Sequence, residues 1–259
     1  MDPATIIGVI VTFACVIFSM VMEGGSPMAI VKIPALVLIF GGTLGACMAG
    51  TTIAGTLGAF KWLAAALTAK KPDMEAVIDP LVKMAERARR EGLLALEAEM
   101  DAVDDPFMKK GLQMAVDGTD PDDLYDILSA EVKSKKAAIA QGASFWGDAG
   151  GYSPTIGIIG TVLGLIHVLE NLSNPASLGE LIAAAFVATL WGVLSANAMF
   201  LPFAARIKAV GKAEAIRMEL IIDGVLAIQA GANPRVVATK LKSKIVPTGP
   251  QAPSEEAAA

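Results

Sequence analysis

The stretch Tyr152–Phe203, which reads YSPTIGIIGTVLGLIHVLENLSNPASLGELIAAAFVATLWGVLSANAMFLPF, decides the fold of this chain. It contains two apolar runs, Tyr152–Leu169 and Leu181–Phe203, separated by a short polar turn. At about 1.5 Å per residue, each run is long enough to cross a hydrocarbon core of ~30 Å. Neither run holds Asp, Glu, Lys or Arg in its interior. The pattern therefore predicts two consecutive membrane-spanning helices.

Small residues recur at helical spacing along both predicted helices. Because lipid tails are as apolar as the side chains, membrane helices associate through close backbone contact at small residues. The predicted packing surface consists of Gly157, Gly160, Gly164, Ala188 and Gly192.

Each run also carries a hydroxyl near its middle, Thr161 and Thr189, and a proline near one end, Pro154 and Pro202. From the residues alone, the threonines are interpreted as packing residues whose hydroxyls bond back to their own backbone. Pro154 is interpreted as a first-turn proline. Pro202 is expected to remove a helical hydrogen bond and bend its helix.

Composition excludes several classes of function. The 259 residues are 54% hydrophobic, with a mean hydropathy of +0.57, which indicates several membrane spans. A net charge of −5 and only 5% aromatic residues argue against a nucleic-acid partner. Two cysteines and one histidine are too few ligands for a metal site. No catalytic constellation is recognisable, so we predict no enzyme activity, no catalytic residues, no metal and no cofactor.

The order of composition along the chain predicts an all-α membrane protein with four transmembrane helices and a helical cytoplasmic domain. The second span begins near Pro34, and the stretch from Thr51 to Phe60 is interpreted as its extension. The predicted segments are 1–60 for transmembrane helices 1 and 2 with an outer turn, 61–150 for the cytoplasmic domain, 151–203 for transmembrane helices 3 and 4, 204–245 for cytoplasmic C-terminal helices, and 246–259 for a disordered tail.

Helix boundaries within the polar segments follow from local signals. Asp105 and Asp120 each precede a proline, which predicts an N-cap followed by a first helical residue. The helix opening at Pro121 is expected to run on towards the third span. Lys and Arg gather in 61–150 and 204–259, with Lys32 as the exception, so both termini are predicted to be cytoplasmic.

The segment Met84–Met100, MAERARREGLLALEAEM, mixes charges of both signs with a leucine cluster. Gly92 is expected to end a helix there. One interpretation is a solvated face whose salt bridges contribute ~0.2–1 kcal/mol each. The other is an electrostatic docking surface for another protein.

Five motifs resemble the MotA/PomA subunits of bacterial flagellar stators. They are ARREGLLALE (Ala88–Glu97), DDPFMKKGLQMAVDG (Asp104–Gly118), PTIGIIGTVLGLI (Pro154–Ile166), FVATLWG (Phe186–Gly192) and GANPRV (Gly231–Val236). The resemblance extends over roughly residues 1–245. It implies a multi-pass protein of the bacterial inner membrane that functions in motility and chemotaxis.

The resemblance also implies partners. A homo-pentamer of such a subunit surrounds a dimer of MotB/PomB-like partners, which anchor to peptidoglycan and supply a transmembrane aspartate. Ion flow through the complex, surrounded by membrane lipid, turns the pentamer, and the cytoplasmic domain pushes on the rotor protein FliG.

By match to the family, Arg89, Arg90 and Glu97 are expected to contact the rotor. A second acid of some relatives is replaced here by Ala98, with Glu99 one residue further on.

The same match assigns the coupling of ion flow to motion to Pro154 and Pro202. It places Thr161 and Thr189 on the ion pathway, with Thr189 beside the partner's aspartate. Thr161 occupies a site that is threonine in sodium-driven relatives and often alanine in proton-driven ones, which favours sodium over protons as the driving ion.

Two other functions stay open at this point. An energiser subunit of the ExbB/TolQ type is disfavoured by the four predicted spans, because those relatives have three. A membrane scaffold that conducts nothing is compatible with the residues.

Overall fold

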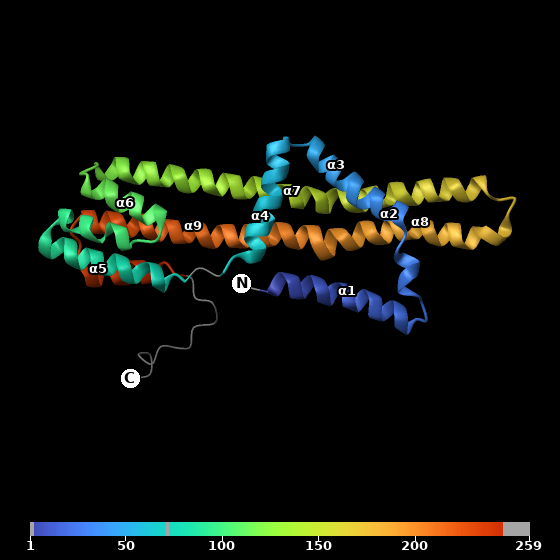
Figure 1. Ribbon diagram of the computed structural model, residues 1–259, viewed down its shortest axis with the longest axis horizontal. Helices are drawn as coiled ribbons and strands as arrows, with labels where there is room; N and C mark the ends of the chain where they lie inside the picture. The colour runs from blue at the N-terminus through green and yellow to red at the C-terminus, as the bar shows by residue number, and fades with distance from the viewer. Residues whose placement is uncertain (1–2, 71–72, 246–259) are drawn as a thin grey trace. The chain divides into compact units, whose positions relative to one another are not determined.

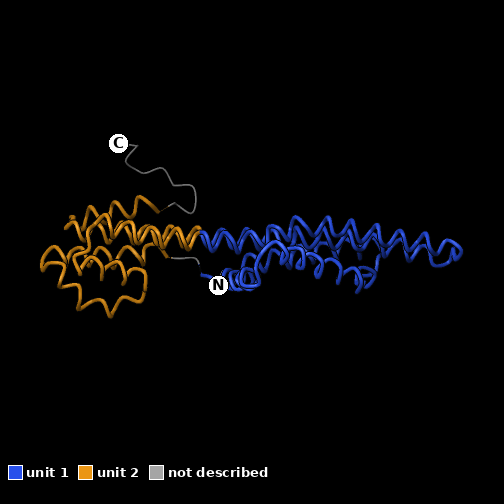
Figure 2. The backbone as a smooth tube through the Cα atoms, turned by 90° about the horizontal axis from the view of Figure 1, so that it is seen from above, with its two compact units in different colours: residues 1–71, 137–211 blue, residues 72–136, 212–259 orange. Residues whose placement is uncertain are grey.

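The computed structural model describes residues 3–70 and 73–245, and every regular element in these ranges is an α-, 3-10 or π-helix. The predicted all-helical class is confirmed. The chain splits into two compact units, coloured separately in Figure 2. One contains residues 1–71 and 137–211, and the other contains 72–136 and 212–259. The long helices α7 (Pro121–Glu170) and α9 (Leu201–Gln229) each contribute to both units.

The first unit holds the most apolar helices. Its elements are α1 (Ala4–Met22), η1 (Pro27–Ile30), α2 (Ile33–Leu36), the π-turn η2 (Val37–Gly41), α3 (Gly42–Ala49), α4 (Ile53–Thr68), α8 (Pro175–Ser195), the π-turn η4 (Ala196–Phe200), and parts of α7 and α9 (Figure 1). In the described chain, three helices are long and apolar enough to cross a membrane: Ala4–Met22, Pro121–Glu170 and Pro175–Gln229. The helices Ile33–Ala49 and Ile53–Thr68 are apolar but shorter.

The prediction that the stretch up to Phe60 extends the second span is wrong. That helix ends at Ala49, and Thr52 starts a new one by accepting a 3.0 Å hydrogen bond from the Gly55 amide. A threonine at the N-cap satisfies an amide that the first turn leaves unpaired, which favours a new helix. The resulting helix α4 runs across α7 and α9 within the first unit (Figure 1).

An aromatic cluster holds α4 on the two long helices. The Trp146 ring lies 5.0 Å from that of Phe60 and 5.6 Å from that of Phe203, centroid to centroid. The indole of Trp146 also donates a 3.1 Å hydrogen bond to the Ala59 carbonyl. A buried indole N–H needs a partner, and here the backbone of α4 supplies it.

The second unit contains α5 (Glu75–Glu91), the 3-10 helix η3 (Leu93–Ala102), α6 (Pro106–Val116), α10 (Pro234–Ser243), and parts of α7 and α9. It has a leucine- and isoleucine-rich core, whose fully buried members include Ile78, Leu81, Leu96, Leu112, Leu124, Leu128, Leu220, Ile221, Ile228 and Leu241. These residues form the hydrophobic core of the second unit.

Several local predictions are confirmed. The Asp105 carboxylate accepts from the amides of Phe107 and Met108 at 2.9 and 3.1 Å, and Asp120 accepts from the Asp122 amide at 2.9 Å. Gly92 ends α5 with φ of 87°, a conformation that favours glycine. The helix that opens at Pro121 runs without interruption to Glu170.

Candidate functional site

The helices α7 and α8 pack antiparallel along a line of small residues, here called the α7–α8 seam (Figure 1). A Cβ atom on Gly160 would lie 2.6 Å from the Ala188 Cβ, and one on Gly192 would lie 2.7 Å from the Ser153 carbonyl oxygen. Neither distance leaves room for a side chain. The residues of the seam are Gly157, Gly160, Gly164, Ala185, Ala188 and Gly192.

Thr161 and Thr189 meet across this seam, and their hydroxyl oxygens contact each other. The Thr161 hydroxyl also reaches the carbonyls of Gly157 at 3.2 Å and Ala185 at 3.1 Å, and the Thr189 hydroxyl reaches the Gly157 carbonyl at 3.3 Å. Both side chains are half-buried, so one side of the pair is open at the surface of the subunit. The geometry gathers four neutral oxygens at one point, a ligand type that suits an alkali cation.

The two prolines lie inside long helices. Pro154 is in the interior of α7, so its interpretation as a first-turn proline is wrong. The charged stretch and the apolar run form one continuous helix, and Pro154 therefore removes a hydrogen bond within it. Pro202 follows the π-turn η4, in which the Leu201 amide donates to Ala196, five residues back. A π-turn beside a proline accommodates the missing donor.

The sequence analysis missed two serines at the seam. Ser153 and Ser195 are fully buried, and their hydroxyl oxygens are 2.7 Å apart. The available signal was a hydroxyl directly before Pro154 and another three residues after Gly192, each within an apolar run.

The residues predicted to contact the rotor lie on the surface of the second unit. Arg89, Arg90 and Glu97 are all exposed, on α5 and η3. Arg90 Nη1 is 4.0 Å from Glu86 Oε1. Arg87 instead joins the two helices, because it pairs with Glu91 at 3.1 Å and also with Glu99 on η3. These hydrogen bonds, that to Glu99 first, raise the pKa of Arg87.

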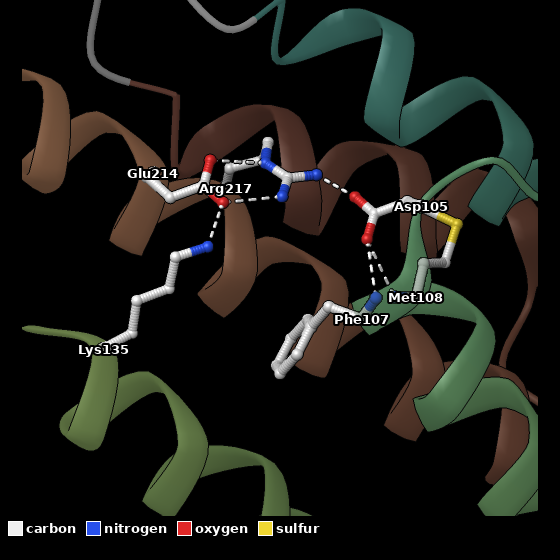
Figure 3. Close-up of polar contacts among 6 residues, drawn as sticks. All are labelled: Asp105, Phe107, Met108, Lys135, Glu214 and Arg217. Atoms are coloured by element: carbon white, nitrogen blue, oxygen red, sulfur yellow. Dashed lines mark hydrogen bonds and ion pairs between the residues drawn. The ribbon is translucent and has the colours of Figure 1, made fainter. Parts of the chain in front are cut away.

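A second charged network lies at the start of α6 (Figure 3). The Arg217 guanidinium of α9 contacts the Asp105 carboxylate and binds Glu214 through two 2.8 Å hydrogen bonds. Lys135 of α7 donates to Glu214 at 2.8 Å. Partial burial lowers the pKa of Arg217. Because Asp105 also caps α6, the network fixes the chain directly after η3 to both α7 and α9.

Comparison with known proteins identifies the class that this architecture represents. Residues 6–92 match the family model described as "Motility protein A N-terminal". Residues 99–220 match the "MotA/TolQ/ExbB proton channel family". An all-helical chain with long apolar helices and this match is a multi-pass protein of the inner membrane.

Comparison with individual relatives shows to which family within this class the chain belongs. The chain is 38% identical to Motility protein A of Bacillus subtilis (strain 168), over 93% of this chain and 90% of the relative. It is 36% identical to "Chemotaxis protein PomA" of Vibrio alginolyticus, over 94% and 95% of the two chains. The chain therefore belongs to the motility protein A family.

Two solved structures share the fold. The first, "Structure of C. jejuni MotAB", aligns with a TM-score of 0.92 at 28% identity, over 96% of this chain and 98% of that chain. The second is the "flagellar MotAB stator complex from Bacillus subtilis". It aligns with a TM-score of 0.87 at 36% identity, over 94% and 96% of the two chains.

Proposed function

We propose that this chain is the ion-conducting subunit of a bacterial flagellar stator, in which ion flow produces torque on the rotor. The observation that carries the proposal is the full-length likeness to two MotAB structures. The proposed assembly is a pentamer of this chain around a dimer of MotB/PomB-like partners that anchor to peptidoglycan. The match of residues 6–92 to the motility protein model favours this function over an energiser of the ExbB/TolQ type.

The proposed topology has four spans: α1, the helix Ile33–Ala49, the apolar part of α7, and α8 with η4. At about 1.5 Å per residue the helix Ile33–Ala49 is ~25 Å long, at the lower limit for a span. The proposed segments are those of the sequence prediction, namely 1–60 and 151–203 in the membrane with 61–150 and 204–245 in the cytoplasm. The tail 246–259, predicted to be disordered, lies outside the described residues.

One ion pair supports this topology. The segments proposed to face outward are about Glu23–Ile33 and Glu170–Glu180. Lys32 Nζ of the first lies 3.3 Å from Glu180 Oε1 of the second. This ion pair supports a common membrane side for the two outer segments, and the distribution of Lys and Arg supports a cytoplasmic position for both termini.

We infer that the Thr161–Thr189 pair lies on the ion pathway. Within the apolar runs of this chain there is no carboxylate, so the acid that attracts a cation into the low-dielectric core must come from the partner. Hydroxyl and carbonyl oxygens replace the water of a sodium ion, whereas a proton needs only the carboxylate and a water path. The oxygens around Thr161 therefore support sodium as the driving ion, with protons as the alternative.

The exposed charges Arg89, Arg90 and Glu97 are proposed to contact the rotor protein FliG. Arg89 and Glu97 have no ion pair within the described chain, so they are available to a partner. Arg87, by contrast, is occupied by Glu91 and Glu99. Glu99 thus ties η3 to Arg87 of α5, and it does not replace the second acid that Ala98 lacks.

The test is ion flux in liposomes that contain this chain with or without its partner. Flux should require both chains and should be lost when the transmembrane aspartate of the partner is replaced by asparagine. Titration of sodium at fixed pH, followed by titration of pH at fixed sodium, identifies the ion. Specific flux from this chain alone contradicts the proposed pathway, and absence of flux from the assembled complex favours a passive scaffold.

A further inference from the structure

Ser153 of α7 and Ser195 of α8 form a polar contact in the interior of the first unit. Both residues are fully buried, and their hydroxyl oxygens lie 2.7 Å apart. Each hydroxyl has a single proton, so one serine donates to the other, and the accepting serine donates its own proton to a carbonyl. If Ser195 donates to Ser153, Ser153 donates across the seam to the Gly192 carbonyl at 3.0 Å. If Ser153 donates to Ser195, Ser195 donates to the Trp191 carbonyl on its own helix at 2.7 Å.

Such a contact is costly to open. A buried hydroxyl that loses its partner keeps the desolvation penalty and gains nothing in return. Close packing adds to this, because the Gly192 Cβ position lies 3.0 Å from the Gly157 Cα. The two helices therefore stay in register at this level.

On one side of the serine pair lies the Thr161–Thr189 pair. The two pairs are eight residues apart on α7 and six apart on α8, or about 12 and 9 Å at a rise of 1.5 Å per residue. The seam glycines Gly157 and Gly192 fill the interval. Apart from Pro154, which directly follows Ser153, this part of the described seam has no proline, and it has no π-turn.

On the other side the helices are weakened. Pro154 cannot donate to the Gly150 carbonyl, and Pro202 cannot donate to the Ala198 carbonyl. Gly150 packs against Leu201, since a Cβ on Gly150 would lie 2.5 Å from the Leu201 Cδ2. The two weakened turns, 150–154 and 198–202, therefore lie near one level of the antiparallel pair. The first includes Ser153, and the π-turn η4 begins directly after Ser195.

We propose that Ser153 and Ser195 are positioning residues that form a hydroxyl clamp. The clamp confines bending to the level of Gly150 and η4, and it keeps the Thr161–Thr189 oxygens aligned. This inference rests on the proposed ion pathway and assigns it two residues that do not touch the ion.

Single substitutions test the clamp without leaving an unpaired hydroxyl. In Ser153→Ala, Ser195 keeps the Trp191 carbonyl, and in Ser195→Ala, Ser153 keeps the Gly192 carbonyl. Each variant loses the bond between the two hydroxyls. The matched control is Thr155→Ala on the same helix, because the exposed Thr155 hydroxyl bonds only to the Tyr152 carbonyl on its own helix.

The measurement is the ion concentration that gives half-maximal flux in liposomes containing the whole complex, with sodium and protons titrated in turn. For the conducted ion, each serine variant should raise this concentration about three- to tenfold, the range expected for one lost hydrogen bond. Thr155→Ala should not change it. The double variant should show no larger shift than the greater of the two singles, because both act through one bond.

Several outcomes overturn the clamp. If the serine variants have the same half-maximal ion concentration as Thr155→Ala, the hydroxyl bond does not position the threonines. The same conclusion follows if the shifts of the two single variants add in the double variant. Loss of both single variants from the membrane shows a folding contact instead. If the wild-type complex carries no ion at all, the proposed function fails and the clamp fails with it.

Discussion

The α7–α8 seam and the Asp105–Arg217 network hold helices together by opposite means. At the seam the contacts are glycine against backbone and hydroxyl against hydroxyl, and Gly192 allows no side chain. In the second unit a leucine-rich core is joined by a chain of ion pairs that runs through Arg217. The first arrangement depends on shape, and the second depends on apolar burial with charges at its edge.

The proposed topology explains the difference, because it puts the seam in the membrane and the second unit in the cytoplasm. In a membrane, apolar side chains gain little by leaving lipid, so helices need close approach and hydrogen bonds to associate. In water, burial of leucine and isoleucine itself stabilises the packing. Pairing of partly buried charged groups offsets their desolvation penalty. The four substitutions below test this contrast, from the largest expected effect on folding to the smallest.

Arg217→Met should cause the largest loss of stability. The side chains of Arg217 and Asp105 are only 21% and 16% exposed. Removal of the guanidinium leaves the Asp105 carboxylate with its two cap amides alone. We expect a loss of about 2–4 kcal/mol, towards the low end for a broken buried pair. Thermal unfolding of the detergent-solubilised protein measures it.

The control for this prediction is Arg90→Met, which removes an exposed arginine whose pair with Glu86 is 4.0 Å long. Its effect should stay below ~0.5 kcal/mol. Asp105→Asn adds a second check, because asparagine caps a helix as well as aspartate does and so removes only the charge. Equal effects of Arg217→Met and Arg90→Met would show that the network does not stabilise the unit.

Gly192→Ala should come second. Its methyl group would lie 2.7 Å from the Ser153 carbonyl oxygen and 3.0 Å from the Gly157 Cα, both backbone atoms that cannot move aside. Overpacking of this kind costs about 1–3 kcal/mol. The matched control is Gly151→Ala, since the Cβ position of that α7 glycine meets no atom within 4 Å in this chain. Both are compared by the yield of assembled complex and its melting temperature, and a Gly192→Ala protein as stable as the control would contradict close packing.

Thr161→Ala should alter folding by less than ~1 kcal/mol, because it removes one half-buried hydroxyl and leaves Thr189 with the Gly157 carbonyl. The substitution should instead change the dependence of rotation on the driving ion. In a sodium-driven complex, rotation should require more sodium or stop, while the size of the complex stays unchanged. Full-speed rotation of the wild type without sodium, slowed by collapse of the proton gradient, would reject sodium as the driving ion.

Local chemistry was predictable from the sequence, whereas distant pairings were not. The caps at Asp105 and Asp120 and the end of α5 at Gly92 depend on atoms within one helical turn, so the residues themselves predict them. Pro154 was interpreted as a first-turn residue from its local context alone. The predicted continuity of the helix that opens at Pro121, which is confirmed, already puts this proline in a helix interior.

The same distinction explains the residues that were missed. Ser153 contacts Ser195, which is 42 residues away in the sequence, and Arg217 contacts Asp105, which is 112 residues away. No spacing in a single sequence indicates such pairs, because they arise only when helices from different parts of the chain pack. The threonines Thr161 and Thr189 were singled out by their place near the middle of each run, and the structure brings them into contact.

Ion flux and rotor speed, measured on the same complexes, test most directly whether the seam carries ions and the charged surface carries torque. Arg89→Glu changes an exposed side chain with no ion pair in the described chain, so it should leave folding and flux near wild type. Rotation should nevertheless be lost, because the sign of a docking charge is reversed. Thr161→Ala should reduce flux and rotation together. Two results for Arg89→Glu would contradict the assignment of ion conduction to the seam and of torque to the charged surface. One is flux that falls in proportion to rotation, and the other is rotation that continues at full speed.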